Sequence, residues 1–284
     1  MNSHPDIDKT VSIHQIASDS KLDCNDLVTI EEPMEIRISF IRDGKKVMQQ
    51  VSVTMRTPGN DKDLAAGFLY SEGIISANEQ INEVVVTGVD SQGRSTNNIV
   101  RVDLDDKVEL DSSRLQRNFI SNSSCGVCGK LSLDSLAVKG IQKLSPSQPT
   151  VSSSVIYGLP ASLRKIQPAF ERTGGIHAAG IAELCGTILD VREDIGRHNA
   201  VDKLIGALLQ SGDLPAAERI MVVSGRAGFE IVQKAIVAGV PIMVAVGAPS
   251  SLAVELATEY KMTLIGFASE NRFNIYSEAG RIID

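Results

Sequence analysis

The run Arg219-Ile-Met-Val-Val-Ser224 is a continuous apolar segment, and two similar segments follow it at residues 241–246 and 262–267. Between them, residues 228–238 and 250–260 repeat apolar side chains at helical spacing. Short apolar strands that alternate with helices are typical of a parallel sheet with helices packed on it. The sequence therefore predicts an α/β fold for the C-terminal part of the chain.

Each of these predicted strands ends in a loop of small or polar residues: Ser224-Gly-Arg-Ala-Gly228, Gly247-Ala-Pro-Ser-Ser251 and Ala268-Ser-Glu-Asn-Arg272. Ligands of open parallel sheets bind beyond the carboxyl ends of the strands. The first two loops also begin helices, whose free amides attract anions. One such loop could equally be a tight turn, but three together favour an anionic, nucleotide-like ligand. Neither the phosphate-loop pattern nor the Gly-x-Gly-x-x-Gly fingerprint is present.

The first half of the chain carries a different pattern. Residues 1–26 are polar and lack an apolar period, so we expect a disordered tail. Apolar residues alternate through residues 35–55 around Asp43-Gly44, which predicts a hairpin. A helix at residues 64–69 and strands at residues 84–86 and 99–104 should complete this part.

We therefore expect four regions along the chain. They are the tail at 1–26, a smaller antiparallel β-rich subdomain at 27–120, a cysteine loop with a short helix at 121–145, and the α/β domain at 146–284. In the last region, residues 153–170 should be helical in part, with interruptions at Pro160 and Pro168.

Composition excludes several classes of protein. The net charge is −7 and the 28 Lys and Arg are scattered, which argues against nucleic-acid binding. No apolar run approaches the roughly 20 residues of a membrane span, and the N-terminus lacks a signal-peptide pattern. We expect a cytoplasmic protein without membrane contact. Four cysteines are too few for a disulfide framework, so reduced thiols are expected.

The segment Asn122-Ser-Ser-Cys-Gly-Val-Cys-Gly-Lys130 places Cys125 and Cys128 between glycines that leave both sulfurs accessible. A helix predicted to begin here and the adjacent Lys130 would both favour thiolate. Sulfur or thiol transfer ranks first among the possible roles and redox dithiol chemistry second. A metal site ranks third, because zinc needs about four ligands and the chain has no second pair. No structural metal is expected.

The sequence does not decide the roles of two histidines and their neighbours. His177, beside glycines, suits a ligand contact or a hydrogen-bonded packing role equally well. His198 stands at a predicted helix start and could donate a hydrogen bond there. Asp194 and Arg197 could simply pair with each other.

The chain closely resembles the formate dehydrogenase accessory sulfurtransferase family, FdhD, from about Glu32 to the C-terminus. The resemblance rests on motifs that occur in the family's order: Arg56-Thr-Pro-Gly59, Ala66-Gly-Phe-Leu-Tyr-Ser-Glu-Gly73, Ser124-Cys-Gly-Val-Cys-Gly129, Thr173-Gly-Gly-Ile-His-Ala178, Glu193-Asp-Ile-Gly-Arg-His-Asn-Ala-Val-Asp-Lys203, Ser224-Gly-Arg226, Gly247-Ala-Pro-Ser-Ser251 and Arg272-Phe-Asn-Ile-Tyr276.

The resemblance implies a sulfur carrier that takes sulfur from a cysteine desulfurase. It would pass this sulfur to the molybdenum bis(molybdopterin guanine dinucleotide) cofactor of formate dehydrogenase, and it would work as a homodimer. Cys125 would carry the persulfide and Cys128 would assist. The cofactor would bind on one loop, which comprises Phe267, Ala268, Ser269, Glu270, Asn271 and Arg272. The loop argument adds four candidates, Gly225, Arg226, Gly247 and Ser250, and His177 is a separate candidate.

The resemblance also implies a cytidine-deaminase-like C-terminal sheet flanked by helices. Zinc deaminases need a metal-binding His or Cys followed two residues later by Glu, and a Pro-Cys-x-x-Cys helix start. At the positions we take as equivalent, His177-Ala-Ala179 lacks the Glu and Pro249-Ser-Ser-Leu-Ala253 lacks both cysteines. We expect no deaminase activity. The alternative to sulfur transfer is a cofactor-binding chaperone whose dithiol senses redox state.

Overall fold

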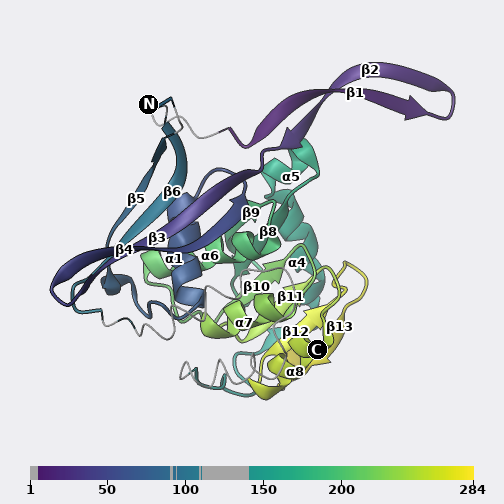
Figure 1. The fold of residues 1–284 in the computed structure, drawn as a ribbon. Helices are drawn as coiled ribbons and strands as arrows, with labels where there is room; N and C mark the ends of the chain where they lie inside the picture. Colours follow the sequence, from purple (N-terminus) through teal and green to yellow (C-terminus); the bar gives the residue numbers. More distant parts are fainter. Residues whose placement is uncertain (1–5, 90–91, 94, 109, 111–140) are drawn as a thin grey trace.

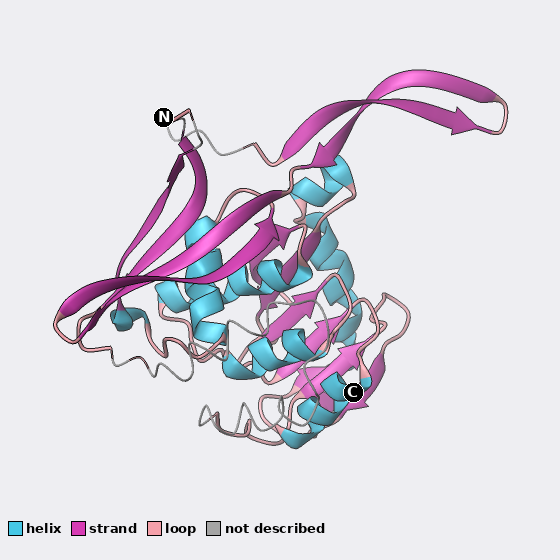
Figure 2. Cartoon of the chain, in the orientation of Figure 1, coloured by secondary structure: helices cyan, strands magenta, loops and turns pink. Residues whose placement is uncertain are grey.

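The computed structural model describes residues 6–89, 92–93, 95–108, 110 and 141–284. These residues form two main sheets with helices between and around them (Figure 1, Figure 2). Cys125, Cys128 and the short helix expected after them lie outside the described residues, so these predictions stay predictions.

The N-terminal elements are β1 (Asp8–Ala17), β2 (Ser20–Thr29), β3 (Glu32–Arg42), β4 (Lys45–Arg56), α1 (Asp61–Ser71), the 3₁₀ turn η1 (Asn78–Gln80), β5 (Ile81–Val89) and β6 (Ser95–Leu104). The C-terminal elements are β7 (Val151–Ser152), α4 (Ser153–Lys165), α5 (Pro168–Thr173), β8 (His177–Ala182), β9 (Ile188–Asp194), α6 (Arg197–Ser211), β10 (Ile220–Val223), α7 (Phe229–Val237), β11 (Ile242–Ala245), α8 (Ser251–Glu259), β12 (Thr263–Gly266), β13 (Asn274–Ser277) and β14 (Ile282–Ile283).

The C-terminal sheet has the strand order β13-β12-β11-β10-β8-β9. Strands β10, β11 and β12 are parallel, which confirms the prediction from the three apolar runs, while β8, β9 and β13 join antiparallel. Every residue of the three parallel strands is buried, because helices cover both faces. Helices α6, α7 and α8 pack on one face and α4 on the other.

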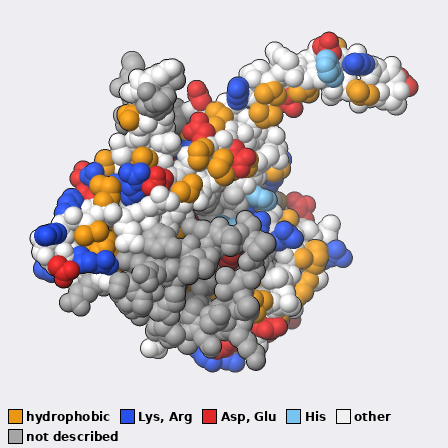
Figure 3. All heavy atoms as spheres, viewed as in Figure 1, with side chains coloured by type: hydrophobic (Ala, Val, Ile, Leu, Met, Phe, Trp, Pro, Cys, Tyr) orange, Lys and Arg blue, Asp and Glu red, His pale blue; other side chains and the backbone are white. Residues whose placement is uncertain are grey.

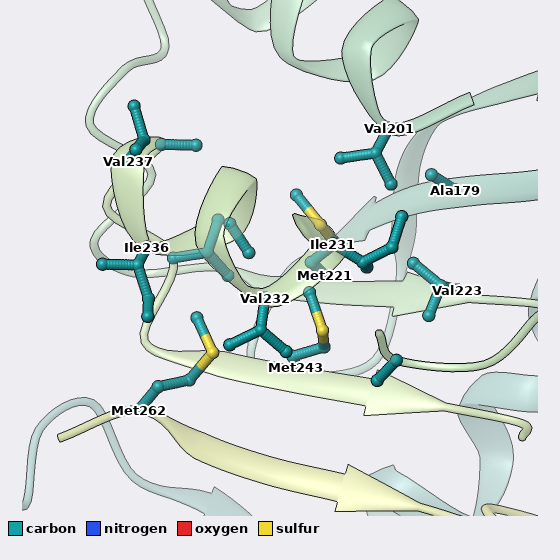
Figure 4. Packing of buried hydrophobic residues seen from close by; sticks show 14 of the residues in the cluster. Ala179, Val201, Met221, Val223, Ile231, Val232, Ile236, Val237, Met243 and Met262 are labelled. Atoms are coloured by element: carbon teal, nitrogen blue, oxygen red, sulfur yellow. The ribbon is translucent and has the colours of Figure 1, made fainter. Parts of the chain in front are cut away.

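Figure 4 shows the packing under α7. Ile231 and Val232 of this helix lie over Met221 of β10 and Met243 of β11. The flexible methionine side chains fill the space between helix and strands, where a branched side chain would leave gaps. This core fixes the three parallel strands, and with them the positions of the loops that follow.

The N-terminal sheet has the order β4-β3-β6-β5, with α1 packed on one face. The predicted hairpin is β3–β4. The expected antiparallel pairing is found for β3–β4 and β5–β6 and is wrong for β3 and β6, which run parallel. Strands β3 and β6 are joined by a long connection through β4, α1 and β5, so local pattern gives no sign of their pairing.

Helices α1 and α6 cross with their backbones in direct contact, and this crossing joins the two sheets. A Cβ added at Gly67 would lie 1.8 Å from the Asp202 carbonyl oxygen, and one at Gly206 would lie 1.9 Å from that of Asp63. Only glycine fits at these two positions. The close approach of the two helices lets α1 contribute to both hydrophobic cores, and Tyr70 packs against each of them.

Residues 8–29 form an antiparallel hairpin, β1–β2, that projects from the body of the protein (Figure 1). The prediction of a disordered tail is therefore wrong for residues 8–26. The strands alternate apolar with charged residues, and none of their side chains joins the hydrophobic cores. The segment contains no sustained apolar run, and the sequence pattern therefore did not indicate these strands.

Pro160 lies inside α4 and does not interrupt it, contrary to expectation. Its ring removes one backbone donor, but buried Ile156, Leu159 and Leu163 hold this helix on the sheet. Pro168 does mark a boundary, because it begins α5, where a missing N–H has no cost.

We predict that Gly67→Ala destabilises the protein by about 1–3 kcal/mol, because the added methyl forces the two helices apart. Chemical denaturation measures the change. Gly158→Ala in α4 is the matched control: its Cβ would meet no atom within 4 Å, so it should be neutral or stabilising by about 0.5–1 kcal/mol. Equal stability of the Gly67→Ala variant and the wild type would contradict the close crossing.

Candidate functional site at the carboxyl edge of the parallel strands

The three predicted ligand loops do lie together at one edge of the C-terminal sheet. The loops after β10, β11 and β12 are joined there by backbone hydrogen bonds. The Gly247 amide donates to the Gly225 carbonyl at 3.0 Å, and the Phe267 amide donates to the Gly247 carbonyl at 3.2 Å. Ala227 forms an isolated bridge with Pro249. The loops therefore make one continuous wall of backbone.

Two of the predicted glycines lie close to neighbouring groups in this wall. A Cβ on Gly225 would lie 3.3 Å from Nδ1 of His177, and one on Gly247 would lie 3.0 Å from the Gly225 carbonyl oxygen. Side chains at these positions would push the loops apart. The structure thus brings Gly225, Gly247 and His177 together, although they come from three separate elements of the chain.

His177 reaches the site because β8 runs antiparallel to β10, so β8 begins where β10 ends. The Ala178 amide donates to Ser224 Oγ at 2.9 Å, and the Ser224 amide donates to the Ala178 carbonyl at 3.0 Å. Burial lowers the pKa of His177, and the nearby Arg197 lowers it further, while Asp194 acts in the opposite direction. A neutral ring at pH 7 can donate or accept one hydrogen bond.

Sequence reasoning left His198 open, and the structure places it at the same edge, at the start of α6. Its Nε2 lies 3.0 Å from a carboxylate oxygen of Glu230 in α7. Burial lowers the pKa of His198 to about 4, with further lowering by the charges of Arg197 and Lys234. The neutral ring can therefore donate a hydrogen bond from Nε2–H to the Glu230 carboxylate.

Three arginines carry unneutralised charge at this edge. Arg197 begins α6, Arg226 follows β10 and Arg272 follows β12. In the described part of the chain, none of the three guanidinium groups makes a hydrogen bond or ion pair, and Nε of Arg197 is buried without a partner. A guanidinium fork left unpaired in this way suits bidentate contact with phosphate. Arg197 is the candidate that sequence reasoning missed.

The loop that follows β12 presents an aromatic ring to solvent. Phe267 is 41% exposed and holds a left-handed backbone with φ 51°, a conformation that is rare for a bulky residue. Val246, at the end of β11, is equally exposed. Ser269 and Arg272 close a turn through a 2.9 Å backbone hydrogen bond, while Glu270 and Asn271 lie exposed in it. Ala268 is buried in the core beneath the loop.

Ser250 has a structural role that weakens its candidacy as a ligand contact. Its side chain accepts a hydrogen bond from the Ala253 amide and so caps α8. One backbone amide in the first turn of α8 is thereby already hydrogen-bonded. By contrast, α6 and α7 begin at Gly196 and Gly228 without a side-chain cap, so their first amides remain available to an anion.

A buried polar network behind the site holds the start of α6 in place. Asp194 is fully buried and pairs with Nζ of Lys203 at 2.7 Å. It also accepts hydrogen bonds from the Thr57 amide at 3.2 Å and from Asn199 Nδ2 at 3.0 Å. The suggested pair of Asp194 with Arg197 is therefore wrong, and this leaves Arg197 free to face the site.

Two further findings concern metals and membranes. Among the described residues, no group of three or more His, Cys, Asp or Glu side chains is arranged to hold a metal ion. Within that same part of the chain, none of the helices combines the length and the apolar character needed to cross a bilayer.

Residues 30–283 match the model of the FdhD/NarQ family. The chain belongs to the FdhD/NarQ family. Curated relatives named sulfur carrier protein FdhD include one from Streptomyces coelicolor, 44% identical over 90% of this chain and 89% of the relative. Another, from Sulfurisphaera tokodaii, is 42% identical over 97% of this chain and 99% of the relative.

The fold has a solved counterpart as well. A crystal structure of a candidate formate dehydrogenase accessory protein from Desulfotalea psychrophila matches with a TM-score of 0.72. It covers 98% of this chain and 100% of the other at 23% identity. This similarity concerns the fold alone. In this FdhD/NarQ chain, the motif 193–203 contributes both the buried network and Arg197, which explains why one stretch holds so many polar residues.

We predict that Lys203→Met destabilises the protein by about 3–5 kcal/mol, because it leaves the buried Asp194 carboxylate without its counter-ion. Urea unfolding measures this loss. Lys165→Met, at an exposed position in α4, is the control and should change stability by less than about 0.5 kcal/mol. The double variant Asp194→Asn with Lys203→Met should recover part of the loss, and a double variant less stable than Lys203→Met would count against the pairing.

Proposed function

We propose that this protein is a cytoplasmic sulfur carrier for formate dehydrogenase maturation. In this proposal Cys125 receives sulfur from a cysteine desulfurase and passes it to the molybdenum bis(molybdopterin guanine dinucleotide) cofactor before insertion. The observation that carries the proposal is the 40–46% identity with proteins named sulfur carrier protein FdhD over about nine-tenths of the chain. The pair Cys125 and Cys128 supplies residues suited to that chemistry.

The loading step is a thiol exchange that needs no added oxidant. The Cys125 thiolate attacks the terminal sulfur of the donor persulfide, the sulfur–sulfur bond of the donor breaks, and the donor leaves as thiolate. Cys125 then carries one additional sulfur. Cys128 lies three positions away, so it can assist by favouring the thiolate form of Cys125. It can also attack the inner sulfur of the Cys125 persulfide, so that the outer sulfur leaves as sulfide and a Cys125–Cys128 disulfide forms.

The residues at the carboxyl edge suit the proposed cofactor, which is a substrate here and carries two pyrophosphate groups and two guanines. Arg197, Arg226 and Arg272 offer unpaired guanidinium groups, and the uncapped start of α7 offers amides. The exposed ring of Phe267 can stack on a planar base. These features support the cofactor loop 267–272 together with Gly225, Arg226, Gly247 and His177.

We further propose that the C-terminal sheet is related to that of the cytidine deaminases without their zinc chemistry. The alternation of strands and helices from β10 to β12 supports the relation, and the residues at the helix starts support the absence of zinc chemistry. At the start of α6, His198-Asn-Ala200 has no Glu two residues after the His, and α7 begins with Gly228-Phe-Glu-Ile231, which contains no cysteine. His177 begins strand β8, whereas His198 lies in the first turn of a helix, so His198 is the better equivalent of the deaminase histidine.

We predict that incubation with a cysteine desulfurase and cysteine, without reductant, adds one reducible sulfur atom to the protein. Cys125→Ala should abolish this gain, because it removes the attacking sulfur, and Cys128→Ala should retain it. Intact mass spectrometry measures each product. Cys185→Ala is the matched control, since Cys185 is an exposed thiol outside the Cys125–Cys128 motif.

No sulfur gain in the wild type, with an internal disulfide in its place, would reject the carrier and favour the alternative, a cofactor-binding chaperone with a redox-sensing dithiol. A gain that survives Cys125→Ala and disappears with Cys128→Ala would move the carrier role to the second cysteine.

We predict that Arg226→Ala weakens binding of guanosine diphosphate by roughly tenfold, the loss of about 1.4 kcal/mol that one charge-assisted contact supplies. Isothermal titration calorimetry measures the affinity. Arg219→Ala is the control, because the half-buried Arg219 lies at the opposite end of β10 from the site. Equal losses in both variants would indicate a general charge effect and would contradict a site at the carboxyl edge.

A further inference from the structure

The N-terminal sheet carries a cavity that sulfur transfer does not use. Its volume is about 540 Å³, and its walls come from β3, β4, β5, β6 and the turn after β6. A cavity of this size can hold a small molecule. None of the described residues that line it belongs to the candidate site at the carboxyl edge.

One buried hydroxyl in this cavity lacks a partner. Ser39 is 1% exposed, and its Oγ is buried without a hydrogen bond to the part of the chain that the structure describes. Its neighbour Phe40 belongs to the core under α1. Because successive strand residues face opposite sides of a sheet, Ser39 points away from α1. An unpaired buried hydroxyl lowers the stability of the fold, so a ligand that bonds to it is favoured.

A positive charge lies near this hydroxyl. Ser39 pairs in register with Asp103 of β6, and Nζ of Lys46 lies 3.7 Å from Oδ2 of Asp103. Asp103 already accepts two hydrogen bonds from Arg101, at 2.8 and 3.1 Å, and this pair offsets its charge. The Lys46 ammonium has three donors and its side chain is 62% exposed, so it can bind a second anion.

Two negative charges complete the lining. Glu83 of β5 pairs in register with Asp103, and Asp106 lines the cavity from the turn after β6. Both are exposed, and within the described residues neither makes a hydrogen bond or an ion pair. Carboxylates without a counter-ion suit an ammonium group. Lys46 and Glu83 come from opposite edge strands of the sheet, so the cavity has a positive and a negative side. Figure 3 shows side chains of both signs interspersed over the N-terminal sheet.

We propose that this cavity binds a free amino acid with an apolar side chain. The ligand carboxylate accepts hydrogen bonds from Lys46 and Ser39, and the ligand ammonium group donates to Glu83 and Asp106. A ligand with only one charge would leave either the lysine or the two carboxylates unpaired. The ligand side chain contacts the apolar part of the lining, which consists of Phe40, Ile41 and Leu104. This site is independent of the carrier proposal, since it shares no residue with it.

Isothermal titration calorimetry of the full chain tests the class of ligand. L-Leucine should bind with one molecule per chain. L-Leucinamide lacks the carboxylate and 4-methylpentanoate lacks the ammonium group, so each should bind at least about tenfold more weakly than L-leucine. Absence of binding at millimolar L-leucine would overturn the proposal. An analogue that binds as tightly as L-leucine would also overturn it, because the cavity would then recognise one charge and not two.

Substitutions locate the contact. Lys46→Met should weaken L-leucine binding at least about tenfold and leave the affinity for L-leucinamide unchanged, because the amide has no carboxylate for Lys46 to bind. Lys45→Met is the matched control, since Lys45 is the exposed neighbour whose side chain faces the other side of the sheet. Both lysine variants should unfold in urea at the wild-type midpoint. Equal losses of L-leucine affinity in the two variants, or an equal loss of L-leucinamide affinity in Lys46→Met, would overturn the proposal.

Discussion

The buried carboxylate of Asp194 is the constraint on which the arrangement of this protein depends. A carboxylate with no exposed surface must replace its hydration with fixed donors. Lys203, Asn199 and the amides of Thr57 and Gly196 supply these donors at 2.7–3.2 Å. They belong to three parts of the chain, so satisfying one charge brings together the end of β9, the start of α6 and the segment after β4.

The same network satisfies backbone carbonyls at the end of β4 and just after it. Asn199 Nδ2 donates to the Met55 carbonyl at 2.7 Å, and Lys203 Nζ donates to the Thr57 carbonyl at 2.9 Å. Together with the close α1–α6 crossing, these bonds fix the N-terminal sheet to the helix that carries Arg197 and His198. A buried ion pair of this kind contributes little net stability, but it specifies one arrangement among alternatives. The position of the candidate site is thus set by the junction between the two sheets.

The sequence predicted those features that depend on local pattern. The apolar runs ending at Val223, Ala245 and Gly266 indicate fully buried strands, and their loops were correctly placed at one edge. Pairings between distant segments could not be found in this way. The parallel pairing of β3 with β6, and the bonds of Asp194 with Lys203 and Thr57, depend on tertiary contacts. The hairpin at residues 8–29 was missed because its apolar residues are separated by charges and lie outside any core.

The charge of the candidate site depends on which of its side chains are ionised. The whole chain has a net charge of −7, but fields from distant exposed carboxylates are screened beyond about 8 Å at physiological salt. At the site itself, three arginines (Arg197, Arg226 and Arg272) outnumber the two carboxylates of Glu230 and Glu270, and an arginine stays charged at any physiological pH. Burial and Arg197 lower the pKa values of His177 and His198, so both rings stay neutral. A bound anion would offset the charge of Arg197 and raise these pKa values, so anion binding and protonation of the histidines favour each other by linkage.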